Sequence, residues 1–297
     1  MIRDTYGVKV FRICNGIIMF LAAALCLAPF INLLAVSISA GSYVAAGRVA
    51  FIPIGINFES YRFVFSSVRF MQSFFVSIQR VLLGVSINMI IVILCAYPLS
   101  KSKGEFKQRG FYSWYFIITM LFVPSLVPSF VVVMNLRLMD TIWALVLPSA
   151  LPVFSVIVML NFFRNLPKEL EESAAMDGAG HLRTLIQIVL PLSKPVIATI
   201  VLFSAVGHWN AWFDGIIYMN RPENYPLQSY LQTILINPAT LIRDMQGDAS
   251  LIAMLMHISN HTLRAAQLFI ATIPILMLYP FLQKYFITGL VLGSVKE

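Results

Sequence analysis

The run ICNGIIMFLAAALCLAPFINLLAVSIS, residues Ile13–Ser39, contains no charged side chain. A helix needs about 20 consecutive apolar residues to cross the ~30 Å hydrocarbon core of a bilayer, and this run exceeds that length. It is also longer than the roughly 7–15-residue apolar core of a secretory signal peptide. The run therefore predicts a membrane span that the mature protein retains.

The rest of the chain is also strongly apolar. Mean hydropathy is +0.83, and only 11% of the residues are charged, against about 25% in a soluble protein. Further long apolar runs predict spans at about 73–100, 110–136, 141–163, 195–217 and 265–285, in addition to the first at 13–39. The runs are continuously apolar and do not alternate as strands of a membrane β-barrel do. We predict an all-α integral membrane protein with six transmembrane helices, forming a single transmembrane domain over residues 1–297.

The basic residues orient these spans. Of the 21 lysines and arginines, thirteen lie on the side that would hold both termini, seven lie on the other side, and Arg80 falls within the second span. Because cytoplasmic loops are enriched in Lys and Arg, we expect cytoplasmic N- and C-termini. Residues 164–194 would then form a cytoplasmic loop, with extracytoplasmic loops at 40–72 and 218–264. The net charge of +8 is explained by this topology and does not indicate nucleic-acid binding.

The loop at 164–194 has its own helical pattern. Pro167 and the acidic residues after it suit a helix N-terminus, whereas Gly178 and Gly180 suit its end, so a short helix is expected at about 168–177. The next residues have apolar side chains at helical spacing, Leu182, Leu185, Ile186 and Val189. We expect them to form one stripe of a helix that lies along the membrane surface.

This loop also carries the motif Glu172-Ser173-Ala174-Ala175-Met176-Asp177-Gly178-Ala179, followed by Ile188-Val189-Leu190-Pro191. The motif resembles the signature loop of the permease subunits of binding-protein-dependent ABC importers, with Ser173 in place of one alanine. The resemblance implies that the short helix is a coupling helix that docks an ATPase. The implied ATPase-docking residues are Glu172, Ser173, Ala174, Ala175, Asp177, Gly178, Ala179, Ile188, Leu190 and Pro191.

Three other stretches are similar to the smaller permease subunit of maltose-type carbohydrate importers: 208–213, 279–286 and the tail 289–297. The resemblance implies an oligosaccharide substrate, and complex saccharides, including uronate-containing ones, remain open. It also implies a bacterial cytoplasmic (inner) membrane location. The expected partners are a homologous second permease subunit, two ATPase subunits that bind ATP and Mg, and an extracytoplasmic solute-binding protein.

Polar and aromatic side chains within the spans are candidates for the substrate path, since polar groups in hydrocarbon usually face a cavity or a partner helix. Aromatic rings beside amides suit sugar rings. However, Trp and Tyr also gather at membrane interfaces without any ligand. Arg80 could contact an acidic sugar, pair with the partner permease or extend toward water, and we favour a structural pair. The candidates are Arg80, Asn88, Tyr115, Trp209, Asn210 and Trp212.

The sequence contains no Gly-x-x-x-x-Gly-Lys phosphate loop, no zinc motif and no nucleophile-elbow pattern. We therefore expect no catalytic residue, no bound metal and no cofactor on this chain, and ATP hydrolysis by a separate subunit. Two alternatives remain open, an ABC permease for a non-sugar solute and a self-contained secondary transporter. The secondary transporter is less favoured because the confident spans lack the coupling carboxylates that it would need.

Overall fold

The computed structural model describes residues 6–122, 124–236 and 258–294, and the chain in these ranges is helical apart from its connections. Its only β-type pairing there is an isolated bridge between Ser39 and Ile56. The chain divides into two compact units, residues 1–71 with 234–273, and residues 72–233 with 274–297. The prediction of an all-α membrane protein is confirmed.

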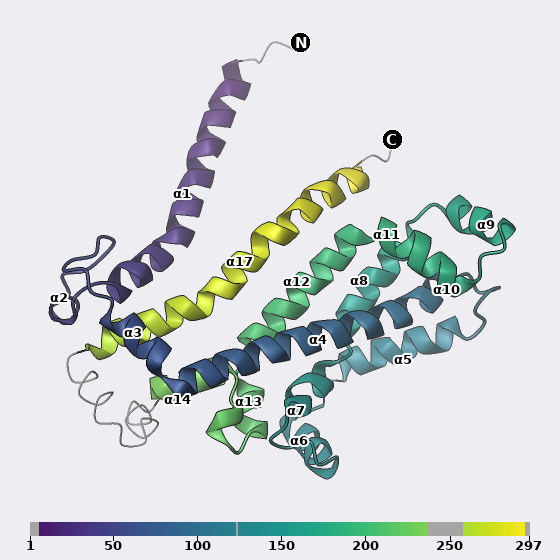
Figure 1. Cartoon of the computed structure of the whole chain (residues 1–297). Helices are drawn as coiled ribbons and strands as arrows, with labels where there is room; N and C mark the ends of the chain where they lie inside the picture. The colour runs from purple at the N-terminus through teal and green to yellow at the C-terminus, as the bar shows by residue number, and fades with distance from the viewer. Residues whose placement is uncertain (1–5, 123, 237–257, 295–297) are drawn as a thin grey trace. The chain divides into compact units, whose positions relative to one another are not determined.

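The first unit contains the long helix α1 (Tyr6–Ser37), α2 (Gly41–Ala45) and α3 (Glu59–Ser66) (Figure 1). The chain after α1 folds back on itself, since the Ala40 N–H donates to the Ile54 carbonyl (3.1 Å) and the Asn57 N–H donates to the Ile38 carbonyl (2.9 Å). Large apolar side chains on α1 are exposed in the isolated chain, including Phe20 and Leu25. Such a surface is stable only against lipid or another apolar helix.

The second unit is built around α4 (Val68–Ser100), a helix that begins in the first unit. α5 (Arg109–Leu121), α8 (Val153–Arg164) and α12 (Lys194–Asn210) pack with it (Figure 1). Shorter elements connect these helices: α6 (Leu126–Asn135), α7 (Ile142–Val146), η1 (Leu147–Ser149), α9 (Lys168–Met176), α10 (His181–Thr184), η2 (Leu185–Val189), α11 (Leu190–Leu192), α13 (Phe213–Tyr218), η3 (Pro222–Asn224) and α14 (Leu227–Ile236). The long α17 (Asn260–Ser294) belongs to both units.

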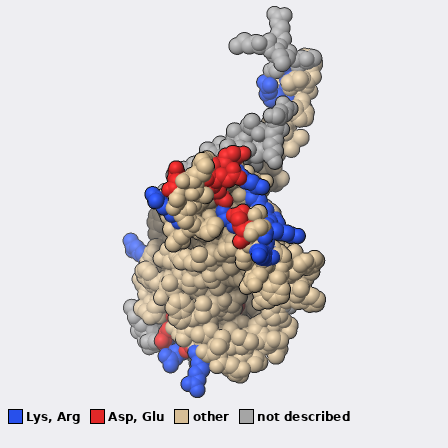
Figure 2. All heavy atoms as spheres, turned by 90° about the vertical axis from the view of Figure 1, so that its right-hand side faces the viewer, with Lys and Arg blue, Asp and Glu red and all other residues tan. Residues whose placement is uncertain are grey.

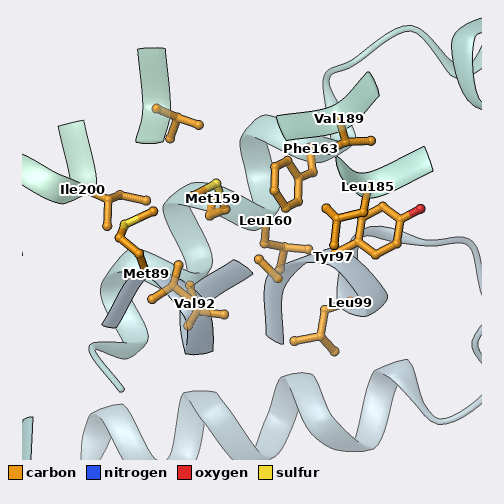
Figure 3. Close-up of a cluster of buried hydrophobic side chains, with 13 residues drawn as sticks. Met89, Val92, Tyr97, Leu99, Met159, Leu160, Phe163, Leu185, Val189 and Ile200 are labelled. Atoms are coloured by element: carbon orange, nitrogen blue, oxygen red, sulfur yellow. The ribbon is translucent and has the colours of Figure 1, made fainter. Parts of the chain in front are cut away.

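A cluster of apolar side chains forms the core of the second unit (Figure 3). Val92 of α4, Met159 of α8 and Ile200 of α12 are fully buried in it. At one end of the cluster, Tyr97 and Phe163 meet edge to face with ring centroids 6.3 Å apart, and Leu185 joins them (Figure 3). This core therefore extends from the packed helices to the segment that connects α8 to α12.

Three helices in the described residues are long and apolar enough to cross a membrane: α1, α4 and the first part of α17. Three further pairs of helices meet at breaks, so up to six spans are compatible with length and composition. In one pair, the segment Ile142–Ser149, made of α7 and η1, is bent by 49° against α8, and Pro148 and Pro152 interrupt the backbone hydrogen bonds of a continuous helix there. The predicted span boundaries and six-span count stay predictions, and residues 237–257 of the outer loop lie outside the described residues.

Candidate functional site

The segment between α8 and α12 begins with α9, in the range where the sequence predicts a short helix. Pro167 precedes the helix, and Glu169 and Glu171 lie in its first turn, where negative charge is favourable because of the helix dipole. Gly178 has a φ of 74°, a left-handed conformation that strains any residue with a Cβ. The turn after α9 thus depends on this glycine, although an added Cβ would meet nothing within 4 Å.

The predicted docking residues of α9 lie mainly on its surface. Ala174 is the only buried residue of the helix. Met176, at its end, is 87% exposed. The other candidates on α9 and the following turn, Glu172, Ser173, Ala175, Asp177 and Gly178, are exposed, and Ala179 is half-buried.

The second half of the segment differs from the sequence expectation. A single apolar stripe was expected, but Leu185 and Val189 are buried in the core cluster, whereas Leu182 is 66% exposed and Ile186 is exposed as well. The physical reason is the π-helical turn η2 over Leu185–Val189, because the wider turn rotates successive residues away from ideal α-helical spacing. Among the remaining docking candidates, Ile188 and Leu190 are half-buried and Pro191 is exposed.

Charged side chains gather around this segment (Figure 2). A cavity of about 860 Å³ lies beside α9 and is lined by residues of α9, the ends of α4 and α8, and the loop that begins at Lys101. Lys101 forms an ion pair with Glu171 of α9, and its Nζ lies 4.1 Å from the centroid of the Tyr97 ring. No spacing in the sequence indicates this pair, since Lys101 and Glu171 are 70 positions apart in the chain.

A second buried ion pair involves Arg80 of α4, one of the substrate-path candidates. Its side chain is 2% exposed and pairs with Asp214 at the start of α13. Arg80 Nη1 also donates to the Ala211 carbonyl (3.2 Å), which lies at the break between α12 and α13. Arg80 therefore forms a structural pair, but its partner in this structure is Asp214 of the same chain, whereas the sequence analysis considered a pair with the partner permease.

Asn88, another path candidate, is buried and joins three elements. With its amide nitrogen toward the carbonyls of Gly84 (3.0 Å) and Ala150 (3.1 Å), its oxygen accepts a hydrogen bond from Ser204 Oγ (2.9 Å). Ala150 follows η1, where the chain is broken before α8, so Asn88 satisfies a carbonyl that the break leaves free. Gly84 contacts the His208 imidazole so closely that a Cβ there would overlap the ring.

The aromatic candidates occupy different environments. Trp209 is buried and meets Phe74 edge to face at a centroid distance of 5.9 Å. Asn210 and Trp212 are exposed near the Arg80 pair, with Trp212 against Phe213. Tyr115 is 56% exposed and lies on α5, where its ring contacts Phe116. Their part in a substrate path stays a prediction.

A polar junction around Asp140 was not anticipated. The Asp140 carboxylate accepts hydrogen bonds from the backbone N–H groups of Asn220 and Arg221 and from Asn224 Nδ2. Burial raises the pKa of this carboxyl group, but those hydrogen bonds and the Arg221 charge outweigh it and hold the pKa below its ordinary value. The junction connects the loop before α7 to the loop after α13.

Within the described residues, no group of three or more His, Cys, Asp and Glu side chains could hold a metal ion.

Comparison with known proteins identifies the family. Residues 88–292 match the model of the family described as "Binding-protein-dependent transport system inner membrane component". The polygalacturonan/rhamnogalacturonan transport system permease protein YtcP of Bacillus subtilis (strain 168) is 39% identical over 94% of this chain and 95% of its own length. Protein LplC of the same organism is 37% identical over 99% of this chain and 97% of its own.

A solved structure is also similar over nearly the whole chain. It is a chain of a bacterial ABC transporter involved in the import of the acidic polysaccharide alginate, with a TM-score of 0.84 and 30% identity, covering 96% of this chain and 100% of that one. The family match and these relatives agree with the loop motif that the sequence carries. The chain belongs to the family of binding-protein-dependent transport system inner membrane components.

Proposed function

We propose that this chain is the permease subunit of an ATP-driven ABC importer for oligosaccharides and that it docks an ATPase subunit through α9. In this function the chain forms half of the translocation path. ATP and Mg bind to the ATPase, and the permease itself catalyses no reaction. The proposal places the chain in the bacterial cytoplasmic membrane with both termini in the cytoplasm.

The observation that carries the docking proposal is the surface of α9 and the elements after it. Met176, Leu182 and Ile186 expose large apolar side chains on a segment that also bears many charges (Figure 2). An apolar patch with a charged rim is typical of a protein–protein interface. The small exposed residues Ser173 and Ala175 would allow the ATPase backbone to approach closely.

The substrate class rests on the relatives. One relative is named for polygalacturonan/rhamnogalacturonan transport, and the similar solved structure is of a transporter involved in the import of the acidic polysaccharide alginate. A saccharide that includes uronate units is therefore the best-supported substrate. The exposed Asn210 and Trp212 provide an amide and an aromatic face that could contact a sugar ring. A permease for a non-sugar solute is the second candidate, and a self-contained secondary transporter is less favoured.

The expected partners follow from the same proposal. The exposed apolar surface of α1 needs lipid or a second permease subunit to cover it. Two ATPase subunits and an extracytoplasmic solute-binding protein would complete the importer. This chain has the same fold as one chain in a structure of a bacterial alginate ABC transporter in complex with an alginate pentasaccharide-bound periplasmic protein, with a TM-score of 0.54.

The docking proposal can be tested by co-purification in detergent after co-expression with the second permease and the ATPase. The double variant Glu172→Lys/Gly178→Asp reverses an exposed charge and strains the turn after α9. Loss of a well-packed interface contact costs about 2 kcal/mol or more, so ATPase recovery should fall by roughly tenfold or more.

A matched control is Glu59→Lys/Gly47→Asp. It makes the same substitutions at an exposed glutamate and at a glycine with a φ of 67° and open space, on the predicted opposite side of the membrane. The control should retain the ATPase. Equal ATPase recovery with both double variants would refute docking through α9.

A further inference from the structure

The way in which α9 is attached to the rest of the second unit limits how it can transmit movement. Ala174 is its only buried residue, and the cavity of about 860 Å³ lies beside the helix. α9 is therefore not held by an extensive apolar interface. Its position depends on the chain continuing into η2, where Leu185 and Val189 enter the core, and on the ion pair between Glu171 and Lys101.

Lys101 is the fixed member of this pair. Its side chain is almost fully buried, whereas that of Glu171 is 31% exposed. The ammonium group lies over the Tyr97 ring, an arrangement stabilised by the negative face of the ring. Tyr97 in turn meets Phe163 of α8 within the core cluster (Figure 3). A displacement of Glu171 would thus act on a lysine that is anchored in the packed helices.

Two arginines secure the end of α4 next to this pair. Arg109 Nη1 donates to the Lys101 carbonyl (2.8 Å) and Arg164 Nη2 donates to the Leu99 carbonyl (3.1 Å). The last carbonyls of a helix have no partner within it, so these bonds hold the C-terminal end of α4 to α5 and α8. The C-terminal end of α4, the start of α5 and the end of α8 can therefore move together.

The other part of α4 carries the Arg80–Asp214 pair. Arg80 and Ser100 are separated by about 30 Å along the helix, at ~1.5 Å per residue. α4 consequently connects α9 at its C-terminal end with the break between α12 and α13 beside its first half, through one ion pair at each place.

We infer that the Lys101–Glu171 ion pair is the link through which movement of α9 is transmitted to α4, and that Lys101 is a positioning residue for transport. The inference rests on the proposed function, because it takes α9 as the helix that the ATPase moves. Beyond that function, the inference requires the Lys101–Glu171 pair for coupling between ATP hydrolysis and transport. The pair is not required for ATPase docking.

The test uses the whole importer, with both permeases, the ATPases and the binding protein, reconstituted in liposomes. Lys101→Glu places two negative charges together and should preserve ATPase recovery while reducing the stimulation of ATP hydrolysis by loaded binding protein. A coupling free energy in the usual range corresponds to a reduction of about fivefold or more. Uptake of labelled saccharide should fall by a similar factor. Glu171→Gln is a milder change at the more exposed member of the pair. It should also reduce the stimulation of ATP hydrolysis and the uptake of saccharide.

The reversed pair Lys101→Glu/Glu171→Lys should restore stimulation and uptake to within about twofold of wild type, which a general loss of structure would not allow. Lys107→Glu makes the same charge change at an exposed lysine of the same loop and should have no effect. The link is refuted if the Lys101→Glu and Lys107→Glu importers behave alike, if the reversed pair gives no recovery, or if Lys101→Glu releases the ATPase. Failure of wild type to retain the ATPase would instead refute the docking proposal.

Discussion

At the scale of single residues, the buried charge of Arg80 is paired by a residue that lies far away in the sequence. Arg80 is buried, yet it pairs with Asp214 and donates to the Ala211 carbonyl. An unpaired guanidinium would be costly to bury, and removing one member of a buried pair usually costs more than the pair contributes. The arginine predicted inside the second span is therefore compatible with a membrane helix because its partner lies nearby in the fold.

Asp140 leads to a prediction about pH. Because its pKa in the folded protein lies below the ordinary value, the ionised carboxylate stabilises the junction above the ordinary pKa of about 4. That contribution is lost as pH falls through the lower folded-state pKa. Asp140→Asn should thus lower the melting temperature of the detergent-purified protein at pH 6, and the difference from wild type should shrink toward pH 3.

Thermal unfolding followed by intrinsic fluorescence at several pH values would check this. Glu223→Gln, a change at another acidic residue near the junction, serves as a control for general charge effects. A difference between wild type and Asp140→Asn that stays constant from pH 6 to pH 3 would contradict the assignment.

At the scale of elements, breaks in the helices are compensated by neighbouring helices. Asn88 of α4 reaches the carbonyl of Ala150, where the chain is interrupted before α8, and Ser229 Oγ donates to the carbonyl of Trp212 (2.7 Å) after the end of α12. The Asn88 contact supplies a donor to a backbone carbonyl that the helix break would leave unsatisfied, whereas the Trp212 carbonyl also accepts a hydrogen bond from the Ile216 N–H of α13 (3.3 Å). The bent elements are thereby held in fixed geometry.

The contact between α4 and α12 gives a prediction at this scale. Gly84→Ala would place a Cβ against the His208 ring, and overpacking of this kind typically costs about 1–3 kcal/mol. The variant should melt at a lower temperature than wild type, while Gly207→Ala on α12, where a Cβ would meet nothing within 4 Å, should not.

Combining Gly84→Ala with His208→Ala should recover part of the loss, because the smaller residue leaves space for the added methyl group. The measurement is the melting temperature of the single and double variants in detergent. Strict additivity of the two single effects would argue against direct contact between the two sites.

At the scale of the whole molecule, the chain is a multi-pass membrane permease, and its orientation is a prediction that can be measured. In a background with Cys14, Cys26 and Cys95 replaced by Ala, a single cysteine is introduced by Lys107→Cys or by Arg48→Cys. Both positions are exposed, and the basic-residue distribution places them on opposite sides of the membrane.

A membrane-impermeant thiol reagent added to intact cells should label the Arg48→Cys variant and leave the Lys107→Cys variant unlabelled until the membrane is permeabilised. The opposite pattern would reverse the proposed orientation. It would also remove α9 from the side on which an ATPase is available.

Several features of this protein were predictable because they depend on neighbouring residues. Uncharged runs such as 13–39 are long enough to span a bilayer wherever they occur, and this is why the helical membrane class was predicted correctly. Gly178 follows the end of α9 because glycine adopts the left-handed conformation of this turn without strain. The loop motif that indicates the family could be recognised in the same way, since its residues lie within one short loop.

Other features depended on the tertiary structure. Lys101 meets Glu171 and Arg80 meets Asp214 across long stretches of chain, and no spacing in the sequence indicates such pairs. The stripe expected from Leu182 to Val189 was divided by the π-helical turn, and its residues Leu185 and Val189 enter a core that also contains side chains of α4, α8 and α12. The sequence by itself determined which segments are helical and apolar, because those properties are local. Only the packing of distant helices decided which polar groups became partners, because burial makes an unpaired charge too costly to remain.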